Sequence, residues 1–150
     1  MSVSVQAQDF DVGAETAALT AGQDALGAVA SFVGLVRGGD GLVAMTLEHY
    51  PAMTAGALEA IVRQARARWP LGPVRVIHRV GRLLPGERIV FVGVTSRHRQ
   101  AAFEACAFIM DYLKTRAPFW KKEERADGAH WVEARESDEA ALAKWGESAP

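Results

Sequence analysis

A buried strand followed at once by a long amphipathic helix dominates this sequence. Residues 88–95 contain the run Ile89-Val90-Phe91-Val92-Gly93-Val94, and such apolar, β-branched runs are typical of central strands. Residues 97–116 then show a helical pattern with one apolar stripe at Ala102, Cys106, Ile109 and Leu113. Thr95 or Ser96 is the expected N-cap, and Pro118 ends the pattern because proline interrupts helical hydrogen bonding. A single thiol on this apolar stripe predicts that Cys106 is a core residue.

The remaining segments alternate between the same two patterns. A second long helix is predicted from Pro51 to about Trp69, because a residue that precedes proline disfavours helix. Strands are predicted at residues 3–5, 28–36, 42–49, 73–80, 119–122 and 131–134, and short helices at 11–19 and 138–145. The strands at 28–36 and 42–49 flank a glycine-rich loop, so we expect them to pair as a hairpin.

This order of elements predicts a single domain over residues 1–150 with an α/β fold. We expect an α+β sandwich, in which the two long helices pack on a mixed, mostly antiparallel sheet. A small additional β-region is expected near the C-terminus. The length of 150 residues and the hydrophobic content of 49% are sufficient for a substantial core.

Charge and composition exclude several classes of function. The formal net charge is −1, whereas domains that bind nucleic acid through a broad surface are strongly basic. No apolar run approaches the roughly 18 residues of a membrane span, and the N-terminus lacks the pattern of a signal peptide. We therefore expect a cytoplasmic protein. The one cysteine permits no intramolecular disulfide, so any sulfur chemistry would need sulfur from another molecule.

Positive charge is concentrated between Lys114 and Lys122. Four cations lie in nine residues, Lys114, Arg116, Lys121 and Lys122, around the proline that ends the predicted helix. One interpretation is that Lys114 simply complements the negative end of the helix dipole. The other is that lysines on both sides of the bend converge on an anion pocket. There, neighbouring cations and partial burial would lower a lysine pKa and make the amine usable in catalysis.

Three other basic positions allow both a structural and a functional interpretation. His98 and Arg99 fall in the first helical turn, where the dipole favours acids. Either they face solvent at a small cost in free energy, or an anion such as phosphate offsets that cost. Arg37 ends an apolar strand and could face water or grip a phosphate. Arg135 lies between two glutamates, so a structural ion pair is equally consistent with the sequence. The four histidines lack the spacing of a metal site.

Taken together, these segments resemble the large, catalytic subunit of molybdopterin synthase over about residues 10–145. The segments that carry the resemblance are Phe32-Val33-Gly34-Leu35-Val36-Arg37, Leu47-Glu48-His49-Tyr50-Pro51-Ala52-Met53, Arg68-Trp69-Pro70-Leu71-Gly72, Val76-Ile77-His78-Arg79-Val80-Gly81, Val92-Gly93-Val94-Thr95-Ser96-Arg97-His98-Arg99 and Met110-Asp111-Tyr112-Leu113-Lys114-Thr115-Arg116-Ala117-Pro118-Phe119-Trp120-Lys121-Lys122. The last segment is highly specific.

The resemblance implies a reaction and its partners. Members of this family add two sulfurs to cyclic pyranopterin monophosphate to make the dithiolene of molybdopterin. The sulfur arrives as a thiocarboxylate on the C-terminal Gly-Gly of a small ubiquitin-like carrier subunit. The catalytic subunits form a homodimer within a heterotetramer, and the reaction requires no resident cofactor or metal. The phosphate of the substrate and the anionic tail of the carrier would account for the local cations.

The resemblance also implies roles for individual residues. Lys114 and Lys121 match the two catalytic lysines. The implied substrate-binding residues are Leu35, Val36, Arg37, His98, Arg99, Lys114, Lys121, Lys122, Glu123 and Arg135. Of these, His98, Arg99 and Arg135 are candidates for serving the pocket of a neighbouring subunit.

Two other classes of function fit the residues alone. A non-catalytic module that binds a phosphorylated ligand or nucleotide would need the same cations but no carrier protein. An interaction protein could use Phe119 and Trp120 as interface anchors, although that reading leaves the basic helix start unexplained.

Overall fold

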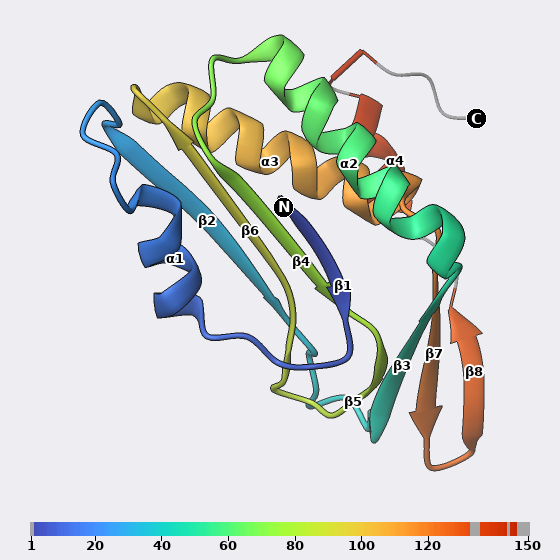
Figure 1. Ribbon diagram of the computed structural model, residues 1–150. Coiled ribbons are helices and arrows are strands. Elements are labelled where there is room, and N and C mark those ends of the chain that lie inside the picture. Colours follow the sequence, from blue (N-terminus) through green and yellow to red (C-terminus); the bar gives the residue numbers. More distant parts are fainter. Residues whose placement is uncertain (1, 133–135, 144, 147–150) are drawn as a thin grey trace.

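The computed structural model describes residues 2–132, 136–143 and 145–146 of the chain, and its strands form two separate sheets (Figure 1). The main sheet has the order β1-β4-β6-β2, where β1 is Val3–Gln6, β4 Val74–Arg79, β6 Arg88–Ser96 and β2 Ala28–Leu35. β1 runs parallel to β4, and the other neighbours are antiparallel. The expectation of a mixed, mostly antiparallel sheet is confirmed, and the predicted central strand is the interior strand β6.

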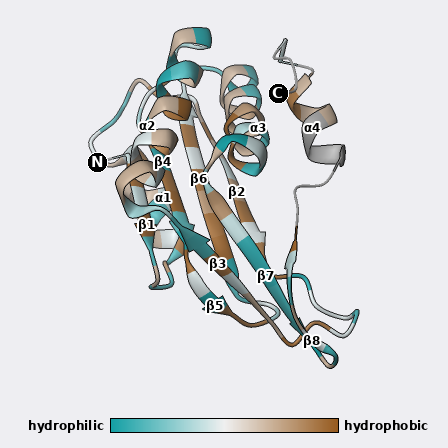
Figure 2. Cartoon of the chain, turned by 90° about the vertical axis from the view of Figure 1, so that its right-hand side faces the viewer, coloured by the Kyte–Doolittle hydropathy of each residue, from teal (hydrophilic) through white to brown (hydrophobic). Residues whose placement is uncertain are grey.

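The second sheet is antiparallel and has the order β5-β3-β7-β8. Its strands are β5 (Gly81–Leu83), β3 (Ala44–His49), β7 (Phe119–Arg125) and β8 (Gly128–Val132). The predicted hairpin of residues 28–36 with 42–49 is therefore wrong, because β2 pairs with β6 while β3 pairs with β5 and β7. Gly39 and Gly41 adopt positive φ in the loop that carries the chain from one sheet to the other. Figure 2 shows β7 as largely hydrophilic, unlike the strands of the main sheet.

Two long helices cover one face of the main sheet, as predicted. α2 (Pro51–Arg68) has proline in its first turn and ends before Pro70, and α3 (Arg99–Arg116) ends before Pro118. Their apolar stripes meet alternate residues of β6 in the main core, which includes Leu58, Ile61, Val90, Val92, Val94, Ala102, Cys106 and Ile109. The prediction that Cys106 is a core residue is confirmed, and burial raises the pKa of its thiol to about 11.

The start of α3 differs from the prediction. Strand β6 continues through Ser96, and His98 is the N-cap residue. Thr95 and Ser96 are buried, and their hydroxyls donate to the carbonyls of Pro73 and Pro70 at 2.8 Å each. These side chains are thus committed to the loop that precedes β4 and are not available to cap the helix.

The opposite face of the main sheet carries a smaller core under α1 (Val12–Thr20). Phe91, which alternates with the main-core residues of β6, packs there with Phe10, Leu19 and Ile77. Asp11 caps α1 by accepting a hydrogen bond from the backbone N–H of Ala14 at 3.0 Å.

Aromatic contacts attach the C-terminal part of the chain to the two long helices. α4 is Glu136–Ala143, and Leu142 in it belongs to the main core. Trp145 packs edge-on against Trp69 and Phe108 at ring distances of 5.6 and 5.4 Å, and its indole N–H donates to Asp111 at 2.6 Å. These contacts hold Trp145 beside α2 and α3.

None of the helices in the part of the chain that the structure describes combines the length and apolar character needed to cross a membrane.

Candidate active site

The segment from Lys114 to Glu123 turns sharply between the last turn of α3 and strand β7. Lys114 is exposed in that last turn, Ala117 is the C-cap in extended conformation, and β7 begins at Phe119. Proline at 118 cannot continue the helix, so the chain leaves α3 and enters the second sheet. The structure thus brings both predicted catalytic lysines to the two arms of one turn.

Strand β7 presents its predicted site residues on both faces. Phe119, Lys121 and Glu123 lie opposite His49, Leu47 and Met45 of β3. Lys122 points to the other face, where its ammonium group lies 5.2 Å from the ring centre of Trp131. The Glu123 carboxylate accepts a hydrogen bond from Arg125 at 2.9 Å, so its charge is already partnered within the strand.

A small apolar cluster links β3, the neighbour of β7, to the residue that follows β2. Leu47, the cross-strand neighbour of Lys121, packs in this cluster with Val36, Met45 and Leu83. The Val36 side chain is buried there, and its N–H and C=O pair with Glu87 and Gly86. Leu35 and Arg37 on either side of it are exposed. Val36 is thus fixed in this cluster, and Arg37 follows it at an exposed position.

Two histidines beside Phe119 were not recognised as site residues from the sequence. The ring of His78 in β4 stacks on Phe119 with centroids 3.9 Å apart and planes inclined by 17°. His49 lies on Phe119 at 6.5 Å, and its buried Nδ1 has no hydrogen-bond partner among the described residues. The pKa of His78 is lowered to about 4, mainly by burial and also by the charges of Lys114 and His49, whereas the hydrogen bond to the backbone of Arg79 acts in the opposite direction. The signal in the sequence was the position of His78 on the apolar face of its strand.

His98 and Arg99 lie at the opposite end of the molecule from Lys114. Both are exposed at the start of α3, which has no acid in its first turn. Lys114 lies fifteen positions after Arg99 in the same helix, which corresponds to about 22 Å along the axis. Arg37 is also remote from His98. It follows the end of β2 where Leu35 pairs with Arg88, whereas His98 lies near the other end, where Ala28 pairs with Ser96. One chain therefore divides its predicted substrate contacts between two ends.

Arg135, the last predicted contact, lies outside the described residues. No group of three or more His, Cys, Asp or Glu side chains within the described ranges is arranged to hold a metal ion.

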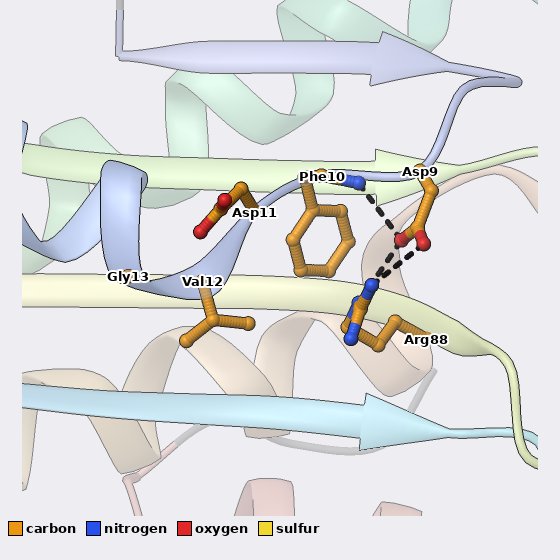
Figure 3. Close-up of a pocket in the computed structure, with 6 residues that line it drawn as sticks. All are labelled: Asp9, Phe10, Asp11, Val12, Gly13 and Arg88. Carbon is orange, nitrogen blue, oxygen red and sulfur yellow. Dashed lines mark hydrogen bonds and ion pairs between the residues drawn. The ribbon is translucent and has the colours of Figure 1, made fainter.

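An open pocket of about 550 Å³ lies elsewhere, beside the start of α1. Its lining residues are Asp9, Phe10, Asp11, Val12, Gly13 and Arg88. Figure 3 shows Arg88 held by two hydrogen bonds to Asp9, of 3.0 and 2.7 Å. Asp9 neutralises this guanidinium and none of the predicted site residues lines the pocket, so we take the turn between α3 and β7 as the candidate active site.

Comparison with known proteins identifies the family of the chain. Residues 5–116 match a family model described as MoaE protein. The chain belongs to the MoaE family. The molybdopterin synthase catalytic subunit of Escherichia coli (strain K12) is 60% identical over 146 residues, which cover 95% of this chain and 97% of that protein.

Solved structures of MoaE proteins share the fold. The molybdopterin biosynthesis MoaE protein from Burkholderia ambifaria MC40-6 has a TM-score of 0.85 and 54% identity, with coverage of 98% of this chain and 99% of that chain. A protein–protein complex of subunits 1 and 2 of molybdopterin-converting factor from Helicobacter pylori 26695 has a TM-score of 0.76 at 20% identity, with coverage of 90% and 92%. The second match supports the MoaE fold alone.

Family membership confirms the class of function inferred from the sequence. This MoaE chain is an enzyme subunit of molybdenum cofactor biosynthesis, with the activity class of a molybdopterin synthase catalytic subunit. The non-catalytic binding module is not supported.

Proposed function

We propose that this MoaE chain transfers sulfur to cyclic pyranopterin monophosphate from the C-terminal thiocarboxylate of a small ubiquitin-like carrier that ends in Gly-Gly. The observation that carries the proposal is the turn closed by Pro118, which has Lys114 on its helical arm and Lys121 on its strand arm. Cys106 is buried and its thiol pKa is raised to about 11, so the sulfur comes from the carrier. The Helicobacter pylori protein of the same fold was solved as a complex of subunits 1 and 2, so the proposal gives this chain a partner subunit as well.

The two lysines take different positions in this mechanism. Lys114, exposed at the end of α3, engages the tail of the carrier and assists release of its sulfur. Lys121 stabilises the anion that develops on the substrate or moves a proton. Arg37 binds the phosphate through its guanidinium. The reaction uses no resident cofactor or metal ion, and we assign it to the cytoplasm.

A second copy of the chain completes the phosphate site in this proposal. His98 and Arg99 lie too far from Lys114 to serve the same pocket, so they serve the pocket of the neighbouring subunit, together with Arg135. Strand β2 is an uncharged edge strand of eight residues with exposed Val29, Phe32 and Leu35, a surface suited to pairing with another strand. Two catalytic subunits with one carrier each give a heterotetramer.

Antiparallel pairing of two β2 strands would bring the separated groups together. It places the Arg37 end of one strand beside the Ala28 end of the other. At that end, the N–H of Gly27 donates to the carbonyl of Ser96 at 3.0 Å, two residues before His98.

A reconstituted assay with thiocarboxylated carrier tests the catalytic assignment. Lys114→Ala should lower the rate of molybdopterin formation about 100-fold or more, because a group at the reacting centre is lost. Arg63→Ala, on an exposed face of α2, is the matched control and should keep the wild-type rate. A folded Lys114→Ala protein with the wild-type rate would remove Lys114 from the mechanism. Failure of the chain to bind a Gly-Gly-ended carrier on a sizing column would refute the carrier step.

A further inference from the structure

The ring of His78 connects the two sheets at the active site. His78 belongs to β4 of the main sheet, whereas its stacking partner Phe119 is the first residue of β7 in the second sheet. Phe119 also packs against the main core, and His49 of β3 contacts its ring. The stack is therefore a side-chain joint between the two sheets, one residue beyond Pro118.

The orientation of the His78 ring is fixed from the other side. Its Nδ1 lies 2.8 Å from the backbone carbonyl of Arg79, and because a carbonyl only accepts, Nδ1 carries the proton. Arg79 is itself buried and donates to the carbonyls of Ala7 and Arg88 at 2.9–3.1 Å. The imidazole thus rests on a rigid part of the main sheet.

The two predicted catalytic lysines lie in the two parts of the molecule that this stack connects, the main sheet with its helices and the second sheet. Lys114 belongs to α3, which packs on the main sheet, and Lys121 belongs to β7. Phe119 and Lys121 are two residues apart in a strand, so their side chains share one face. A displacement of the Phe119 ring would therefore move Lys121 relative to Lys114.

We propose that His78 is a positioning residue, whose neutral imidazole stacks on Phe119 and sets the place of Lys121 relative to Lys114. The inference rests on the proposed function, since it assigns importance to the distance between these lysines. Charge supports it, because the charged groups that act on the ring, Lys114 of α3 and His49 of β3, both oppose its protonation, although the hydrogen bond to the backbone of Arg79 favours it. A neutral ring can pack on Phe119 without adding another positive charge to those of Lys114 and Lys121.

The test compares two substitutions that separate the ring from its nitrogen atoms. His78→Phe keeps an aromatic ring for the stack, whereas His78→Asn keeps a donor for the Arg79 carbonyl and loses the ring. We expect His78→Asn to lower kcat at least about tenfold with little change in KM, because a small misplacement of a catalytic group is costly. His78→Phe should keep kcat within about threefold and leave the pH profile of kcat unchanged. His130→Asn, on the exposed strand β8, is the matched control.

Each outcome bears on the proposal. A folded His78→Phe protein that is as slow as His78→Asn would show that a nitrogen atom is required and would overturn the positioning role. A wild-type kcat in His78→Asn would also overturn it. If His78→Phe does not fold, Phe119→Leu removes the other ring of the stack and should reproduce the loss of kcat. An unchanged kcat in Phe119→Leu would show that the stack does not position Lys121. Lys114→Ala and Lys121→Ala in the same assay separate the two proposals, because wild-type rates there would contradict the proposed function itself.

Discussion

At the scale of single residues, His78 ties the stability of the fold to pH. Its pKa is about 4 in the folded chain and about 6.5 in an unfolded one, so between these values only the unfolded chain takes up the proton. The contribution of His78 is complete above pH 6.5. We expect the free energy of unfolding to fall as the pH is lowered towards 4, by at most about 3 kcal/mol.

Urea unfolding followed by circular dichroism at a series of pH values measures this effect. His78→Phe has no proton to take up at this position, so its stability should decline less than that of the wild type over the same window. Parallel pH dependence of the two proteins would contradict the assignment. The carboxyls of Asp9 and Glu87 have pKa values lowered by their hydrogen bonds, so their contributions are lost at lower pH and are common to both proteins.

At the scale of elements, strand β2 should control the assembly of the chain. A lysine in an edge strand opposes strand pairing, because its charge would have to be buried between the two chains. Ser31→Lys, at an exposed position of β2, should therefore shift the proposed dimer towards monomer in sedimentation velocity. Gln23→Lys adds the same charge at an exposed position outside β2 and should leave the dimer intact. An unchanged dimer in Ser31→Lys would place the interface elsewhere.

The elements also show what the sequence could and could not predict. Both long helices were predicted closely, because Pro51, Pro70 and Pro118 mark their ends through local backbone chemistry. The pairing of β3 could not be predicted, since residues 42–49 fit either sheet and long-range contacts decide between them. The short strand β5 was missed because three residues carry no periodic pattern.

At the scale of the whole molecule, the divided site predicts complementation between inactive chains. In the proposed dimer each pocket uses Lys114 of one chain and Arg99 of the other. Lys114→Ala and Arg99→Ala proteins should each be slow alone, but after unfolding and refolding together the mixed dimers contain one intact pocket. Random pairing then gives about one quarter of the wild-type rate. A mixture no faster than its components would show that both residues serve the same chain, and Arg63→Ala mixed with Lys114→Ala controls for simple dilution.

The separation of the predicted contacts between the two ends of α3 explains which parts of the site could be found from the sequence. Clustered cations at Lys114 to Lys122 and at His98-Arg99 are local features, so each group was found without a structure. Their separation by the length of α3 depends on the fold. His78 was missed as a site residue because its neighbour Phe119 lies forty-one positions away and in a different sheet.

α3 is one uninterrupted helix of 18 residues with Lys114 in its last turn and Arg99 at its start. In the proposed dimer these two ends face different pockets. Because α3 is packed along its length in the main core, the fold fixes the separation of its two ends. A pocket that needs both ends therefore forms only where two chains meet, and its geometry depends on the packing between them.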